Sequence, residues 1–344
     1  MAAGQPPYFG AAYYPEDWPL DQIDADIDLM KQAGMNCMRI GEFAWSRMEP
    51  EEGRYDFGWL DTVIDKLGAA GIATILGTPT CTPPSWLYQR YPECIAVRDD
   101  GVRLEHGARR HACPNSSAYR DHCRRIVTAM ATEFGQDSNV VGWQIDNELY
   151  LVRGLEDHRG CFCDECVGKF RKFLQERFGT VEAINAAWGT DLWSQTYQSF
   201  EHIPPPRSGT WHHPSLLTAW SLFQADSYVD FADDQADILH RLASQPVGTD
   251  MTQCSDREPD ARRWGDAVNL GKRSPKGVIG RVDRRFCPRF YGAGRRIEQD
   301  TLGCGGGGVI RAPEESSMAA GQGSNGKSRL TDLLRFVYLP LPVA

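Results

Sequence analysis

Two polar residues, Asn147 and Glu148, follow a short apolar stretch, 140–145, that is rich in β-branched side chains. Such a stretch is typical of a buried strand in a parallel sheet. A carboxylate at the end of such a strand is suited to general acid/base chemistry, and an amide beside it is suited to holding a substrate hydroxyl. We therefore interpret Glu148 as a candidate acid/base and Asn147 as its substrate-binding neighbour. The alternative is a solvated polar turn without a chemical role.

A C-x-C-x-x-C run follows this stretch and holds Cys161, Cys163 and Cys166. Three thiolates this close in sequence can bind one soft cation, and a structural zinc ion takes a fourth ligand. Cys113 is our predicted fourth ligand, with His111 and His158 as the competing donors. Four sulfur ligands leave no position for water, so we expect a structural zinc ion that staples an insertion over about 153–190. The alternative is a set of reduced thiols without metal.

The elements that must position these residues alternate between strand and helix. We expect strands at 8–14, 35–40, 72–77, 140–145 and 246–251, and helices at 20–32, 59–70, 116–134, 167–178, 180–189 and 215–243. Repeated βαβ units indicate a parallel sheet. Apolar strands that each end in a polar and aromatic loop predict an α/β fold, a (β/α)₈ TIM barrel, which carries its chemistry at the carboxyl ends of the strands.

The expected rim also carries aromatic and basic residues. Trp18, Trp45 and Trp86 are candidates for stacking on sugar rings, or they pack as ordinary tryptophans. Arg109 lies on the loop before the helix at 116–134, where it either hydrogen-bonds sugar hydroxyls or pairs with an acid at the surface.

Composition limits the partners and the location. A net charge of −9 argues against nucleic acid as a partner, because phosphate binding needs a basic surface. No stretch of 18 apolar residues occurs, so we expect no membrane partner. The odd number of cysteines, 11, and the lack of an export signal favour reduced thiols and a cytoplasmic protein.

Four motifs in this order resemble glycoside hydrolase family 42, the bacterial β-galactosidases. They are Tyr13-Tyr14-Pro15-Glu16-Asp17-Trp18, Arg39-Ile40-Gly41-Glu42-Phe43-Ala44-Trp45, Gln144-Ile145-Asp146-Asn147-Glu148 and the C-x-C-x-x-C run. The resemblance covers about residues 8–251. It implies a retaining exo-hydrolase of terminal β-D-galactosides, a homotrimer and, in many members, a structural zinc ion.

The resemblance also assigns roles to individual residues. It implies that Glu148 is the acid/base, that Asn147 contacts the substrate, and that Arg109 grips the galactose. The zinc ligands that it implies are Cys113, Cys161, Cys163 and Cys166.

The pattern breaks after residue 251. Basic residues outnumber acidic ones by 16 to 10 from Met251 onward, against 21 to 36 before it, and only Trp264 of the ten tryptophans lies there. We therefore divide the chain into a catalytic domain, 8–251, with the first five βα units, and an anomalous tail, 252–344. We expect the barrel to be incomplete after its fifth strand. Our hypothesis is a frameshift near codon 252, and translation of the coding DNA in the other frames tests it.

The break removes an expected catalytic group. A retaining glycosidase needs a second carboxylate about 5–5.5 Å from the first. In this family it ends the seventh strand, whereas Glu314 and Glu315, at about the right distance along the chain, do not follow an apolar strand. We expect a β-galactosidase by family, with weak or no activity as written. The alternatives are an inactive zinc-stapled carbohydrate-binding remnant, and a related barrel glycosidase such as an α-L-arabinosidase.

Overall fold

Five parallel strands form the sheet in the computed structural model, which describes residues 8–149 and 160–249. They are β1 (Gly10–Ala12), β2 (Cys37–Ile40), β3 (Ala73–Gly77), β4 (Val140–Gln144) and β5 (Val247–Gly248). Neighbours along the chain are neighbours in the sheet, in the order β1-β2-β3-β4-β5. This sequential parallel order, with helices between the strands, confirms the α/β prediction and corresponds to the first five units of a (β/α)₈ barrel. The predicted break after the fifth strand, and the tail 252–344, lie outside the described residues.

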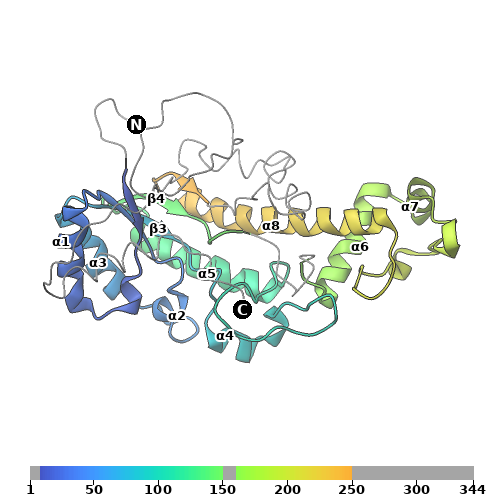
Figure 1. Cartoon of the computed structure of the whole chain (residues 1–344), viewed down its shortest axis with the longest axis horizontal. Helices are drawn as coiled ribbons and strands as arrows, with labels where there is room; N and C mark the ends of the chain where they lie inside the picture. Colours follow the sequence, from blue (N-terminus) through green and yellow to red (C-terminus); the bar gives the residue numbers. More distant parts are fainter. Residues whose placement is uncertain (1–7, 150–159, 250–344) are drawn as a thin grey trace, which may run out of the picture.

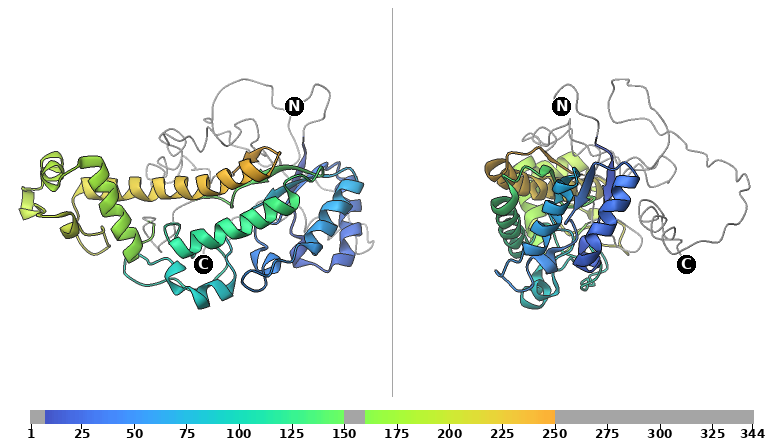
Figure 2. Two further views of the ribbon diagram at one scale, coloured as in Figure 1. Left: turned by 180° about the vertical axis from the view of Figure 1, so that it is seen from behind. Right: turned by 90° about the vertical axis from the view of Figure 1, so that its left-hand side faces the viewer.

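Helices cover the sheet and extend away from it (Figures 1 and 2). The longer ones are α1 (Ile23–Gln32), α3 (Gly58–Ala69), α5 (Ser117–Phe134), α6 (Asp164–Phe178), α7 (Val181–Trp188) and α8 (Pro214–Leu242). Two short helices in the loops after β2 and β3, α2 (Trp45–Met48) and α4 (Ser85–Arg90), were not predicted, because they are too short to show a helical period. None of the described helices is both long and apolar enough to cross a bilayer.

Local sequence explains where these helices begin and end. In α1, Ile23, Ile27 and Met30 recur at helical spacing, and all three are buried. The Ser116 side chain caps α5 by accepting a hydrogen bond from the Tyr119 amide. Helix α7 ends at Gly189, whose φ of 66° is the left-handed conformation that glycine adopts without strain.

The described residues form two hydrophobic cores. The first surrounds the sheet, α1, α3 and α5, and the second surrounds the cysteine run, α6 and the first half of α8. Helix α8 belongs to both, with Trp220 and Phe223 in the second core and Phe231 and Leu239 in the first. Figure 1 shows α8 running from the end that carries β4 to the end that carries α6 and α7.

Candidate active site and metal centre

The turn after β4 presents Glu148 at the carboxyl end of the sheet. Asn147 is 3% exposed, while the Glu148 side chain is 36% exposed and therefore accessible to a ligand. Arg109 forms an ion pair with it, at 3.2 Å between Nη2 and Oε2. The guanidinium of Arg109 also lies 5.8 Å from the centre of the Phe43 ring. The structure thus brings Glu148, Asn147 and Arg109 together on neighbouring loops.

A buried carboxylate, Asp146, organises this turn. Its side chain forms an ion pair with Arg110, which also donates to the carbonyl oxygen of Asn147. Thr80 donates to Asp146 Oδ2 at 2.5 Å, and the Asn147 amide donates to Oδ1 at 2.7 Å. Burial lowers the pKa of Arg110, but the nearby acidic groups, of which the Asp146 carboxylate has the largest effect, together raise it above its ordinary value, so Arg110 stays charged.

Sequence reasoning missed both members of this pair. Asp146 was named only within the motif that ends at Glu148, and Arg110 was given no role. The available signal was Asp146 itself, since an aspartate directly after a buried strand needs a charged or hydrogen-bonding partner.

A second buried carboxylate, Glu42, lies after β2. Arg39 donates through Nε to Glu42 Oε1 at 2.9 Å and through Nη1 to Gln144 Oε1, also at 2.9 Å. Gln144 in turn donates to the carbonyl oxygen of Asp146 at 2.9 Å. The ends of β2 and β4 are therefore tied together by hydrogen bonds beneath the Asn147–Glu148 turn.

Glu16, on the loop after β1, has both carboxyl oxygens buried, and they accept no hydrogen bond from the described residues. Burial raises the pKa of Glu16 to about 8, and the nearby Glu42 carboxylate adds to this effect. The folded protein therefore holds this carboxyl protonated at neutral pH.

Glu16 should make stability depend on pH. The unfolded chain releases this proton near the ordinary glutamate pKa of 4.5, so the stabilisation is complete below that pH and is lost as the pH rises through about 8. Against a Glu16→Gln variant, we expect the wild-type free energy of unfolding to fall by roughly 1.4 kcal/mol per pH unit across this window. Urea unfolding of both proteins from pH 5 to 9 measures this, and parallel curves would contradict the assignment.

The three rim tryptophans differ in exposure. Trp45 is fully buried and donates to Glu49 Oε2 at 2.7 Å, so the prediction that it stacks on a sugar is wrong. Trp86 donates to the Glu49 carbonyl oxygen at 2.9 Å and packs edge-on against His122. Only Trp18, 52% exposed, presents a free ring among these three.

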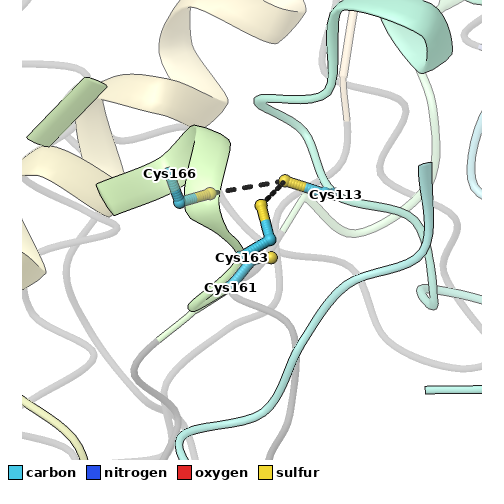
Figure 3. Close-up of side chains that lie close together, drawn as sticks. All are labelled: Cys113, Cys161, Cys163 and Cys166. Carbon is cyan, nitrogen blue, oxygen red and sulfur yellow. Dashed lines mark hydrogen bonds between the residues drawn. The ribbon is translucent and has the colours of Figure 1, made fainter. Parts of the chain in front are cut away.

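Four cysteine sulfurs meet where α6 begins. The Sγ atoms of Cys113, Cys161, Cys163 and Cys166 all lie within 4.8 Å of one another, as Figure 3 shows. Cys113 Sγ lies 3.7 Å from Cys163 Sγ and 3.4 Å from Cys166 Sγ. Tetrahedral zinc with bonds of about 2.3 Å separates its sulfur ligands by roughly 3.8 Å. The residues therefore fit a closed zinc site.

The four neighbouring thiols shift one another's pKa values. Burial and the neighbouring thiols raise the pKa of Cys113 well above its usual value, whereas hydrogen bonds from those thiols, that of Cys113 first, lower the pKa of Cys163. Zinc binds thiolates, so its binding to the four sulfurs would displace the protons that the buried thiols otherwise keep. Of the competing donors, His111 packs against Tyr88 with ring centres 4.6 Å apart, and His158 lies outside the described residues.

The parallel strands, the carboxylate after β4 and the cysteine cluster define a barrel protein with a rim site and a separate thiol centre. The sequence profile of glycoside hydrolase family 42, described as beta-galactosidase, matches residues 12–273. The chain belongs to this family.

Sequence similarity to individual beta-galactosidases supports the same family. The chain is 43% identical over 241 residues to beta-galactosidase YesZ of Bacillus subtilis and 45% identical over 235 residues to a beta-galactosidase of Thermus thermophilus. These matches cover 70% and 68% of this chain but only 36% of each relative. The chain thus spans about a third of their length.

Solved structures of beta-galactosidases support the same family and fold. The beta-galactosidase of Halorubrum lacusprofundi superposes with a TM-score of 0.67 at 39% identity, covering 71% of this chain and 36% of that one. The beta-galactosidase of Marinomonas ef1 gives 0.66 at 38% identity, covering 70% and 37%.

Proposed function

We propose that the protein hydrolyses terminal non-reducing β-D-galactose from galactosides, with Glu148 as general acid/base. The observation that carries this proposal is the accessible Glu148 carboxylate after β4, paired with Arg109 on a turn held by the buried Asp146. The family of the chain and the names of its relatives support galactose as the sugar. The net charge of −9 supports a small galactoside as the partner, in preference to nucleic acid or a membrane.

In the proposed reaction, Glu148 protonates the departing glycosidic oxygen while a second carboxylate attacks the anomeric carbon, and Glu148 then, as a base, activates the water that displaces this carboxylate and releases the sugar. Arg109 and Asn147 hold sugar hydroxyls beside it. The second carboxylate of a retaining mechanism remains unassigned, since Glu314 and Glu315 lie outside the described residues. Weak or absent turnover by this chain remains our expectation.

Hydrolysis of a nitrophenyl β-D-galactoside by the purified chain tests the proposal. Loss of the general acid/base in Glu148→Gln should lower kcat/KM by about 100-fold or more. Glu52→Gln is the matched control, because Glu52 is also a carboxylate paired with an arginine, Arg90, at 2.6 Å. A measurable wild-type rate that is unchanged in Glu148→Gln would contradict the role of Glu148.

The same assay separates the alternatives. Galactose binding without turnover, unchanged by Glu148→Gln, favours a zinc-stapled carbohydrate-binding remnant. Faster hydrolysis of a nitrophenyl α-L-arabinoside favours an arabinosidase, since galactose and arabinopyranose share their ring hydroxyl arrangement.

We further propose that Cys113, Cys161, Cys163 and Cys166 hold a structural zinc ion. Bound there, zinc would tie the loop that bears Cys113 to the start of α6 and would supply no hydrolytic water. Free thiols of this kind persist in a reducing compartment, which supports a cytoplasmic protein. The proposed assembly is a homotrimer, which follows from the family alone.

A further inference from the structure

Gln235 is a buried polar residue in the half of α8 that packs on the first core. It is 1% exposed. Along α8 the buried residues Gln224, Ser227, Phe231 and Gln235 follow one another at spacings of three and four, so they lie on one stripe of the helix. A buried amide on such a stripe needs hydrogen-bond partners from other elements. Gln235 finds them in Thr78 and Thr80, on the loop after β3.

These contacts close a ring around Asp146. The Asp146 amide donates to Thr78 Oγ1 at 2.7 Å, and the Thr78 hydroxyl donates to Gln235 Oε1, also at 2.7 Å. Gln235 Nε2 donates to Thr80 Oγ1 at 3.3 Å, and the Thr80 hydroxyl donates to Asp146 Oδ2 at 2.5 Å. The ring thus begins and ends on the same residue.

Proton accounting fixes the direction of each bond. A threonine hydroxyl has one proton to donate, and an ionised carboxylate only accepts. The Thr80 hydroxyl donates its one proton to Asp146, so the 3.4 Å distance from Thr80 Oγ1 to Gln235 Oε1 is not a second hydrogen bond from Thr80. Thr80 Oγ1 therefore accepts from Gln235 Nε2. The ring therefore needs, at position 235, a side chain with one acceptor for Thr78 and one donor for Thr80. The glutamine amide supplies both.

The ring holds a turn that the backbone does not favour. Asp146 and Glu148 have φ values of 54° and 49°, the left-handed region that non-glycine residues seldom occupy. Such residues persist only where their surroundings fix them. The carboxylate of Asp146 also receives the Asn147 amide, so anything that orients Asp146 orients the two residues after it.

We propose that Gln235 is a positioning residue for Glu148, acting through Thr78, Thr80 and Asp146. The role of Glu148 as acid/base rests on the proposed function, but the geometric claim does not. Gln235→Glu keeps the acceptor for Thr78, removes the donor for Thr80 and adds a negative charge near Asp146. Gln235→Leu removes both the acceptor for Thr78 and the donor for Thr80.

Hydrogen exchange of the full-length protein, followed by mass spectrometry on peptides covering residues 143–149, tests the proposal. In both Gln235 variants, the amides of this turn should exchange about fivefold faster or more, which corresponds to the loss of roughly one net hydrogen bond. The exchange of the α5 and α8 peptides should stay unchanged. Gln224→Leu is the matched control: Gln224 lies on the same stripe, is fully buried, and donates instead to the Cys161 carbonyl oxygen at 3.0 Å. It should leave the turn unchanged.

Two threonine variants approach the ring from its other side, in case the helix variants fail to fold. Thr80→Val keeps the shape but removes the hydroxyl, so it should accelerate exchange of the turn, and Thr80→Ser should restore the wild-type rate. An unchanged turn in Thr80→Val and in the folded Gln235 variants, or equal acceleration by Gln224→Leu, would overturn the proposal. Exchange needs no turnover, so the result for Gln235 does not depend on whether this chain hydrolyses a galactoside, and the assay of Glu148→Gln tests the proposed function separately.

Discussion

Cys113→Ser is expected to abolish zinc binding and to destabilise the second core. Serine places no thiolate at the position where three other sulfurs converge, and structural zinc contributes about 10–16 kcal/mol of binding free energy in small zinc-dependent folds. Elemental analysis should therefore find zinc in the wild type and only traces in the variant. Thermal unfolding should occur at a lower Tm in the variant, and a strong chelator should lower the wild-type Tm in the same way.

Cys94→Ser is the control for this experiment. Cys94 is also fully buried, but it lies outside the sulfur cluster and contacts the Ser116 hydroxyl at 3.7 Å. It should retain the zinc. Equal zinc content in wild type and Cys113→Ser would show that Cys113 is not a ligand, and a wild-type protein without zinc would leave only buried thiols at this position.

Arg110→Met is expected to destabilise the fold by about 3–5 kcal/mol, because it leaves the Asp146 carboxylate buried without its counter-charge. Asp146 is completely buried and the Arg110 side chain is only 7% exposed, so water cannot replace the lost partner. Urea unfolding at pH 7 gives the free energy of each variant. The double variant Arg110→Met with Asp146→Asn should recover part of the loss, since it removes the unpaired charge.

Arg124→Met provides the comparison at the surface. Arg124 pairs with Asp121 at 2.6 Å and with Asp234 at 2.9 Å, and the three side chains are 44%, 60% and 32% exposed. Such pairs contribute less than about 1 kcal/mol. A loss in Arg110→Met no larger than in Arg124→Met would show that the Arg110–Asp146 pair does not hold the turn.

The sequence carried most of the architecture. Mostly apolar runs at 35–40, 72–77 and 140–145 predicted β2, β3 and β4, because strands covered on both faces are largely apolar. Their ends were less predictable: the expected strand at 246–251 is only Val247–Gly248 in the described residues. Strand ends depend on pairing with neighbours, which a single sequence does not record.

The sequence predicted the site residues that lie close together along the chain, but not those whose partners are far away in the sequence. Glu148 and Asn147 could be found because they directly follow a strand, and the cysteine run because its spacing is short. Gln235 could not, since its partner Thr78 is 157 residues away and a glutamine within a helix carries no distinguishing pattern. Sugar stacking and ordinary packing both remained open for Trp45, because a rim position does not reveal that its ring lies inward and donates to Glu49.

Helix α8, with 29 residues, is about 43 Å long and contributes side chains to both cores. Unfolding of either core would therefore remove packing contacts from the other. We therefore expect the two cores to unfold together, so that a ligand bound at either core raises the free energy of unfolding of both.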